Sequence, residues 1–380
     1  MFKKVCAVLL GWVVLIPSAA LAQEYRLTDL GSLSPTGINT WAQVVGNENH
    51  HAFLWSFGHI RRLGTLAGGT FSWAAAINDF GAVTGTADGP GQIVSRFGGS
   101  AIACNDLIQP FIWTEQTQMR GLGTVGPASD EAGFDDNGCP FPFYGAGINN
   151  RGQVVGYTGQ LPDDFQWVFL WTNGGMSIFG ASFPNTYGNG ISNSGEIVGQ
   201  NGPEEGYAAS WKDGVATELA GLPGISEFAG GAANGINDLG QIVGWSTVYD
   251  ESSATSYVHA VTWTPSGSIS DLGTLPGDTD SSASKINTFG LVIGSSGNAV
   301  ANSTIIGGQD STFDVGPLVV IGRPFIWSKA TGMLDLNKLI RPHSGWVLNT
   351  ATDINLWGQI VGEGTLNGEP RGFLLTPTFF

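Results

Sequence analysis

One nine-residue pattern recurs seven times along this chain and constrains its fold more than any other feature. The pattern reads Ile-Asn-x-x-Gly-x-Val-Val-Gly, with substitutions at single positions in individual copies. Self-similarity at a spacing of roughly forty to fifty residues is the sequence signature of a repeat architecture. The seven copies begin at Ile38, Ile77, Ile148, Ile191, Ile236, Ile286 and Ile354.

Each copy predicts four short strands, which we name a, b, c and d in chain order. Strand a consists of small residues before the Ile-Asn pair. The Asn-x-x-Gly tetrad indicates a hairpin turn, because Asn bonds nearby backbone and Gly accepts a positive φ. Ala42 replaces this glycine in the first copy, so we expect it in a strained left-handed conformation. Strands b and c are nearly continuous apolar runs, which indicates strands covered on both faces.

Strand c is aromatic, as in HAFLW from His51, and ends in tryptophan in every copy except the last, where Leu375 stands. Six of the 13 tryptophans are thereby explained as a repeated core position. Strand d is the segment of the type RRLGTL from Arg61 that follows most copies. Four-stranded units at this spacing, with small residues on the first strand, are typical of the tapering blades of a propeller.

The two ends of the repeat array predict a closed ring. Tyr25 to Gly31 resembles a strand d with no a, b or c before it, whereas the last copy stops after strand c. Pairing this first strand beside the one ending at Leu375 removes two exposed sheet edges. An open stack would need capping units, and a two-sheet sandwich is the other alternative. We therefore predict an all-β, seven-bladed β-propeller whose ring is closed by the N-terminal strand completing the last blade.

The elements HAFLW, Asp-Leu-Gly-Thr-Leu and Ile-Asn-x-x-Gly-x-Val-Val-Gly resemble those of the HAF-repeat family of bacterial extracellular proteins. His51-Ala52-Phe53 matches the naming motif in full and His259-Ala260-Val261 nearly so, while the other copies lack the histidine. The resemblance covers almost the whole chain after residue 22. It implies an exported protein, and it brings neither an established activity nor catalytic residues. Because the repeat explains His51 and His259, we interpret both as structural.

The N-terminus predicts export. Lys3 and Lys4 precede a short apolar run, and Ala20-Leu21-Ala22 is a cleavage pattern. We predict a signal peptide over residues 1–22, with an N-terminal membrane anchor as the alternative, and one domain over 23–380. The mature protein would be extracellular or periplasmic, and we expect a monomer. The net charge of -16 of the full chain, which becomes more negative when Lys3 and Lys4 are removed, argues against nucleic acid and anionic membranes as partners. Cys104 and Cys139 are then the only thiols, and in an oxidising compartment we expect them to form a disulfide.

The longest insertions predict one elaborated face. They are the second b–c loop (Thr86 to Leu107), the second d–a loop (Gly126 to Tyr144) and the sixth b–c loop (Ser295 to Gly322). In a propeller all three lie on the same side, where most of the 31 acidic residues also fall and where Arg96 and Arg341 are the clear basic residues. This predicts a negative basin for cations or a cationic ligand, the alternative being simply solvated loops.

Within that basin the densest acidic cluster contains Asp130, Asp135 and Asp136, and carboxylates are suitable ligands for Ca²⁺. The cluster lacks the spacing of a known calcium loop. Aromatic residues at or beside this face could stack on a sugar, and a packing role is the simpler interpretation of each one taken singly. They are Trp73, Tyr144, Trp245 and Tyr249.

Two functions from different classes follow. No metalloprotease, Walker, Cys-x-x-Cys or Gly-x-Ser-x-Gly motif occurs, which favours a non-catalytic binding or scaffold propeller whose ligand is a carbohydrate, a cationic ligand or a protein. The alternative is a carbohydrate-active enzyme, a polysaccharide lyase or a glycoside hydrolase, an analogy from the fold alone. In that case His343 beside Arg341 is the pair suited to acid–base work.

Overall fold

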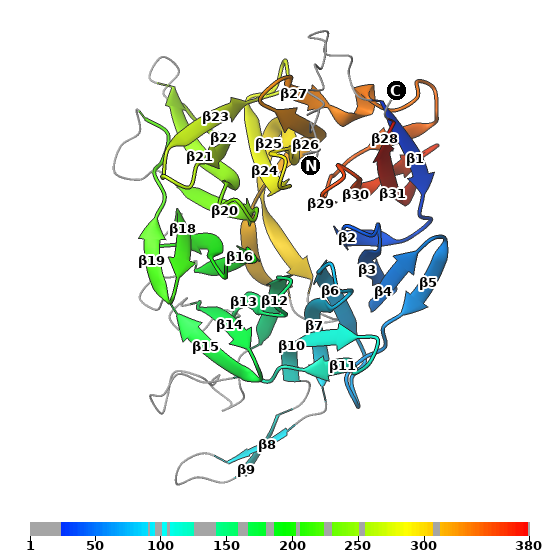
Figure 1. The fold of residues 1–380 in the computed structure, drawn as a ribbon, viewed down its shortest axis with the longest axis vertical. Helices are drawn as coiled ribbons and strands as arrows, with labels where there is room; N and C mark the ends of the chain where they lie inside the picture. Colours follow the sequence, from blue (N-terminus) through cyan, green and yellow to red (C-terminus); the bar gives the residue numbers. More distant parts are fainter. Residues whose placement is uncertain are drawn as a thin grey trace, which may run out of the picture.

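The computed structural model describes residues 24–89, 92–95, 101–104, 107–124, 142–158, 166–179, 186–202, 206–223, 230–250, 255–306 and 312–378. These residues form seven antiparallel sheets arranged as blades around a central axis, with strand a innermost and strand d outermost (Figure 1). The chain is a seven-bladed β-propeller. Within the described residues no helix is long and apolar enough to cross a membrane.

The blades follow the seven copies of the repeat, and in blades 1 to 6 the strands run from the axis outward in chain order. Blades 1 to 4 consist of β2 (Ser34–Ile38), β3 (Val44–Glu48), β4 (His51–Ser56) and β5 (His59–Arg62); β6 (Ser72–Ile77), β7 (Val83–Gly89), β10 (Leu107–Thr114) and β11 (Gln118–Gly121); β12 (Phe143–Ile148), β13 (Val154–Thr158), β14 (Val168–Thr172) and β15 (Gly175–Phe179); and β16 (Tyr187–Ile191), β17 (Ile197–Asn201), β18 (Tyr207–Lys212) and β19 (Val215–Glu218).

Blades 5 to 7 carry the same four positions, with the innermost strand of blade 7 split in two. They consist of β20 (Gly231–Ile236), β21 (Ile242–Asp250), β22 (Thr255–Trp263) and β23 (Ile269–Gly273); β24 (Asp280–Ile286), β25 (Val292–Ile306), β26 (Thr312–Ser328) and β27 (Gly332–Asp335); and β28 (Trp346–Leu348) with β29 (Asp353–Ile354), β30 (Ile360–Leu366), β31 (Glu369–Pro377) and β1 (Tyr25–Asp29). A single 3-10 turn, η1 (Leu336–Lys338), follows β27.

The predicted closure is confirmed. Strand β1 pairs antiparallel with β31, and Leu27 lies opposite Leu375. An apolar cluster containing Phe53 of blade 1 and Val361 and Leu374 of blade 7 packs across the same joint. The first and last segments of the chain therefore share one sheet and one core, so the ring has no open end.

The hydrophobic core is divided among the joints between blades. Each pair of neighbouring blades shares one apolar cluster, and the cluster between blades 1 and 2 is representative. There Leu54 of β4 packs with Phe111 and Trp113 of β10. This explains why strands b and c are apolar on both faces, since each face meets a different neighbour.

The last glycine of the repeat permits a close approach between strands a and b. In six blades the pairing of these strands shifts register at a β-bulge near the end of strand a. A Cβ on Gly46 would lie 2.1 Å from the carbonyl oxygen of Ser34, and one on Gly199 would lie 1.7 Å from that of Tyr187. No other residue fits there without displacing the backbone.

Two segments predicted as loops contain strands. The second b–c connection forms a separate hairpin of β8 (Gln92–Ser95) and β9 (Ala101–Cys104). The prediction of a loop from Ser295 to Gly322 in the sixth b–c connection is wrong. Strands β25 and β26 continue their pairing through this segment as far as Ile306 and Thr312. In the view of Figure 1 this hairpin extends from blade 6 across the centre of the ring.

A candidate binding site at the mouth of the channel

The seven Asn-x-x-Gly turns converge at one end of the central channel, opposite the b–c and d–a loops. In the first turn the side-chain Oδ1 of Asn39 accepts hydrogen bonds from the backbone N–H groups of Trp41 and Gln43, at 3.1 and 3.0 Å. Ala42 has φ 58°, the left-handed conformation expected for it, and Gly81 has φ 76° at the same place in blade 2. The local turn chemistry is therefore as predicted.

The turn asparagines also link neighbouring blades, which the sequence did not indicate. The Nδ2 of Asn39 donates to the backbone carbonyl of Asn78 at 3.1 Å, and Asn78 donates in the same way to Asn149 at 2.9 Å. Equivalent bonds run from Asn149, Asn237 and Asn287 to the next turn, and Asn355 returns to Asn39 at 3.0 Å. Six of these asparagines form a nearly complete circle of hydrogen bonds, and Ser192 occupies the seventh position.

The residue after the first residue of each turn is polar in blades 1 to 6 and is Leu356 in blade 7, and these residues form a second, incomplete polar ring nearer to solvent. The backbone N–H of Thr40 donates to Oδ1 of Asp79, that of Asp79 to Asn150, and that of Asn150 to Asn193, at 2.9, 2.9 and 2.7 Å. The chain continues from Asn193 to Asp238 at 2.9 Å. We call these two rings together the polar mouth.

One carboxyl group of the polar mouth is held in its ionised form. Desolvation favours a raised pKa for Asp79, but hydrogen bonds from the side chains of Thr40 and Asn150 and from the Thr40 backbone outweigh it and lower the pKa. Asp79 is therefore a carboxylate at neutral pH. It remains able to accept further hydrogen bonds, because a carboxylate has about four acceptor positions.

The third turn residue lines the rim of the mouth and is large and apolar in five of the seven blades. These side chains belong to consecutive blades, from 5 through 7 and 1 to 2, and all are more than half exposed. They are Leu239 at 60%, Phe289 at 71%, Trp357 at 57%, Trp41 at 67% and Phe80 at 81%. Arg151 and Ser194 complete the circle in blades 3 and 4. We call the five apolar side chains the apolar rim.

The two tryptophans of the apolar rim are held by their polar edges. The Nε1–H of Trp357 donates to the carbonyl of Thr40 at 3.1 Å, and that of Trp41 donates to the carbonyl of Asp79 at 3.0 Å. Each indole thus reaches across to the next blade and leaves most of its ring exposed. Exposed indoles whose N–H groups are hydrogen-bonded are typical of recognition surfaces, because the apolar face of the ring stays accessible to a ligand.

A cavity of about 260 Å³ lies inside the rim, and every one of the seven turns contributes to its walls. The walls combine the Ile-Asn pairs with the residues that follow them. The five apolar rim side chains do not line the cavity themselves, but each directly follows one of its wall residues in the chain. Among the described residues no group of three His, Cys, Asp or Glu side chains is placed to hold a metal ion.

The aromatic residues predicted as ligand platforms fall on the opposite face. Trp73 on β6 and Tyr144 on β12 occupy equivalent positions of blades 2 and 3 and are partly exposed. Tyr249 lies towards the end of β21 and is also exposed. The prediction for Trp245 is wrong, because its side chain is 3% exposed and packs with Val258 and Val320.

The described acids of the opposite face largely fasten loops. Asp88 is buried and accepts hydrogen bonds from the backbone N–H groups of Thr70 and Phe71, at 2.8 and 2.7 Å. The predicted basic residues of these loops are Arg96 and Arg341, and the structure adds Arg323 on β26. Arg323 pairs with Asp278 at 2.9 Å and with Asp335 at 3.2 Å.

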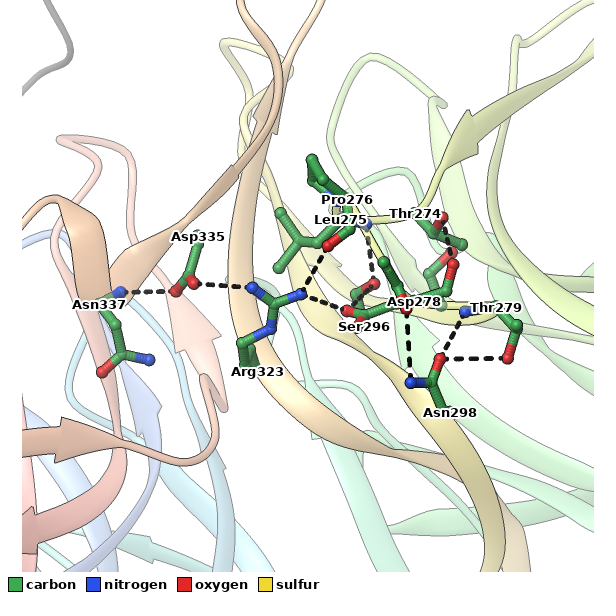
Figure 2. A network of polar contacts seen from close by, with 12 residues as sticks. Thr274, Leu275, Pro276, Asp278, Thr279, Ser296, Asn298, Arg323, Asp335 and Asn337 are labelled. Carbon is green, nitrogen blue, oxygen red and sulfur yellow. Dashed lines mark hydrogen bonds and ion pairs between the residues drawn. The ribbon is translucent and has the colours of Figure 1, made fainter.

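Arg323 is the centre of a network that joins the fifth d–a connection to blade 6 (Figure 2). Besides its two ion pairs it donates to the carbonyl of Pro276 at 3.3 Å, while Ser296 on β25 donates to the same oxygen of Asp278 at 2.9 Å. The carboxylates that suggested a negative basin are neutralised here by an internal partner. This part of the face is therefore built for rigidity.

His343 and Arg341 lie in the exposed segment between η1 and β28, where His343 adopts a positive φ of 56°. Neither has a hydrogen-bond or ion-pair partner within the described part of the chain. The remaining predicted residues lie outside it. These are the signal peptide, the acids Asp130, Asp135 and Asp136, and Cys139, while Cys104 falls on β9.

The apolar rim could have been found from the sequence by comparing the third turn residue across copies. That position reads Trp, Phe, Arg, Ser, Leu, Phe and Trp in blades 1 to 7. A solvated turn favours small polar residues at this position. Large apolar residues repeated there therefore indicate an exposed apolar patch of the kind that marks interaction sites.

No family model matches the sequence, and no curated protein matches it. Among solved structures the chain is similar to an oligogalacturonate lyase in complex with manganese, with a TM-score of 0.52, 10% identity and coverage of 94% of each chain. It is also similar to a streptogramin B lyase (TM-score 0.48, 10% identity, 93% of this chain and 98% of that one) and to the WD40 repeats of RRP9 (0.46, 13%, 93% and 98%). At such identities the likeness shows the fold alone.

Proposed function

We propose that this protein is a non-catalytic binding propeller that takes its ligand at the polar mouth and apolar rim. The observation that carries the proposal is the repeated placement of large, exposed apolar side chains around a polar cavity. Exposed apolar patches with a polar surround mark interaction sites in soluble proteins. Binding sites of this kind combine apolar area with a few placed polar groups. The proposal moves the ligand site away from the acidic face expected from the sequence.

Export through residues 1–22 and membership of the HAF-repeat family belong to the same proposal. The apolar run and cleavage pattern support the first, and the repeated motif supports the second. A binding protein outside the cell would meet polymers, peptides and surface proteins as partners. The two rim tryptophans make the proposal testable without knowing which of these it takes.

The test uses immobilised full-length mature protein and three sets of probes: neutral oligosaccharides, galacturonic acid oligomers and a random peptide library. We expect at least one set to bind the wild type and to be lost in the double variant Trp41→Ala/Trp357→Ala. Phe57→Ala is the matched control, because Phe57 is 83% exposed but lies on the outer c–d turn of blade 1. Undiminished binding to the double variant, or release of cleaved product from any probe, would show the proposal to be wrong.

A further inference from the structure

The ligand must complement two surfaces at once. The apolar rim offers the exposed faces of Trp41, Trp357 and their neighbours, and the polar mouth, whose residues directly precede them in each turn, offers amide, hydroxyl and carboxylate groups. A ligand that covers only the rim leaves the cavity unfilled. A ligand with apolar faces and many hydroxyl groups satisfies both, since its C–H faces pack on aromatic rings while its hydroxyls reach the polar groups.

The polar mouth is rich in groups that suit hydroxyls. Asp79 is a carboxylate whose Oδ2 accepts one hydrogen bond, from Asn150 at 3.0 Å, and has capacity for more. Thr288 supplies a hydroxyl group that can both donate and accept, and the hydroxyl of Thr40, which donates to Asp79, can still accept. This mixture matches polyhydroxylated molecules, which present donors and acceptors in equal measure.

Charge restricts the ligand further. The second residue of the turns is acidic at Asp79 and Asp238, and Arg151 is the one basic residue among the seven turns. The whole chain carries a net charge of -16. Uronic acids, sulfated sugars and phosphates would be repelled by this mouth. A neutral ligand is not subject to this electrostatic repulsion.

A polypeptide partner fits the cavity less well. An apolar side chain inserted into the mouth would remove carboxylate and amide groups from water without giving them new hydrogen bonds, which costs free energy for each group. Protein interfaces usually have an apolar centre and a polar rim, the reverse of the arrangement here.

The rim favours an extended ligand. Its five apolar side chains come from five consecutive blades and therefore follow an arc around the mouth. Trp41 and Trp357 are fixed by hydrogen bonds to the next blade, so stacking on them requires little ordering of side chains. An arc of fixed platforms suits a chain of linked rings better than a single small molecule.

From these observations we infer that the ligand is an uncharged oligosaccharide or polysaccharide, whose sugar rings stack along the apolar rim and whose hydroxyls bond to the polar mouth. This inference rests on the proposed binding function. It adds the chemical class of the ligand.

The experiment is calorimetric titration of the full-length mature protein with cellohexaose, laminarihexaose, xylohexaose and mannohexaose, and with hexagalacturonic acid as the charged comparison. At least one neutral hexamer should bind, and Trp41→Ala and Trp357→Ala should each weaken it by about tenfold or more, the scale of an aromatic hot spot. Phe57→Ala should leave affinity unchanged. Replacing both mouth acids, as Asp79→Asn/Asp238→Asn, should raise the affinity for hexagalacturonic acid.

The outcomes separate the two proposals. If no neutral hexamer binds while hexagalacturonic acid or a library peptide binds and needs Trp41 and Trp357, the inference of an uncharged carbohydrate ligand is wrong, but the proposed binding site is supported. If a neutral hexamer binds equally well to both tryptophan variants, the site itself is misplaced. Binding of no neutral hexamer at all overturns the inference. Thermal unfolding of each variant confirms that lost affinity does not reflect lost structure.

Discussion

At the scale of single residues, the histidine of the HAF motif occupies a position for an ion pair within a blade. In blade 5 the Nδ1 of His259 lies 2.9 Å from Oδ2 of Asp271 on the neighbouring strand d. Arginine takes the histidine's place in blades 6 and 7, where Arg323 pairs with Asp335 and Arg371 pairs with Asp29 at 3.5 Å. These contacts support the structural interpretation of His259 and explain why arginine can replace histidine there.

This pair makes stability depend on pH. The hydrogen bond with Asp271 raises the pKa of His259, and desolvation opposes it less strongly. A group with a raised pKa in the folded state stabilises fully below its unfolded pKa of about 6.5, and loses that contribution as pH rises through the folded value. We expect His259→Gln to lower the free energy of unfolding by up to about 1 kcal/mol at pH 6 and by less at pH 9.

Urea unfolding of wild type and variant between pH 5.5 and 9 measures this difference. The control is His259→Arg, which copies blades 6 and 7 and should keep the ion pair at every pH in that range. A difference between wild type and His259→Gln that stays constant with pH would contradict the assignment.

At the scale of the strand and its turn, the asparagine circle joins blades that the hydrophobic clusters already hold together. It is broken at Ser192, whose short side chain bonds locally, with Oγ accepting from the backbone N–H of Glu196 at 3.2 Å. At the preceding joint, Asn149 donates to the carbonyl of Ser192 itself at 2.9 Å. The backbone of blade 4 is thus already in place for a complete circle.

We expect Ser192→Asn to stabilise the protein by about 0.5–1.5 kcal/mol, the usual net value of one hydrogen bond, through a new bond to the carbonyl of Asn237. The midpoint of thermal unfolding would report it. Asn78→Ala, which removes an existing link and leaves the buried Asn149 carbonyl without that donor, is the matched comparison and should destabilise. An unchanged or lowered midpoint for Ser192→Asn would mean that blade 4 cannot adopt the geometry of its neighbours.

The sequence predicted the turns but not what they build, for a physical reason. Oδ1 of Asn39 bonds residues two and four positions away, which is local chemistry that a pattern reveals. Its Nδ2 bonds the carbonyl of Asn78, 39 residues away, and that partner is in place only once blades 1 and 2 have packed together. The same holds for Trp357, whose indole bond to Thr40 spans the chain ends. Closure itself was predictable, because a strand d without its blade is visible in the sequence.

At the scale of the whole molecule, the joint between blades 7 and 1 is where the ends of the chain meet. Besides the pairing of β1 and β31, one carboxyl group bridges the innermost strands. Oδ2 of Asp353 accepts from the backbone N–H of Ile38 at 2.8 Å, and Oδ1 accepts from that of Ile354 at 2.9 Å. Burial raises the pKa of Asp353 to about 6, although Lys285 and the two backbone donors act in the opposite direction.

The raised pKa predicts that acid strengthens this joint. Between about pH 4 and 6 the native carboxyl keeps its proton while the unfolded one has lost it, so unfolding releases a proton and stability falls as pH rises. The slope contributed by Asp353 is at most about 1.4 kcal/mol per pH unit. Asp79 and Asp271 affect stability in a different pH range. Their pKa values are lowered in the folded protein, so their contributions change only in more acidic solution.

Asp353→Asn should therefore flatten the pH dependence of the free energy of unfolding between pH 4 and 6, because the amide does not titrate and can still accept from Ile38. Asp213→Asn, at an exposed turn of blade 4, should keep the wild-type slope. The slope of the free energy of unfolding against pH is the decisive measurement. Loss of one hydrogen-bond acceptor changes this free energy by the same amount at every pH and leaves the slope unchanged. If the Asn variant keeps the wild-type slope, the carboxyl is already ionised in the ring, and Asp353 contributes nothing to the pH dependence of the closing joint between pH 4 and 6.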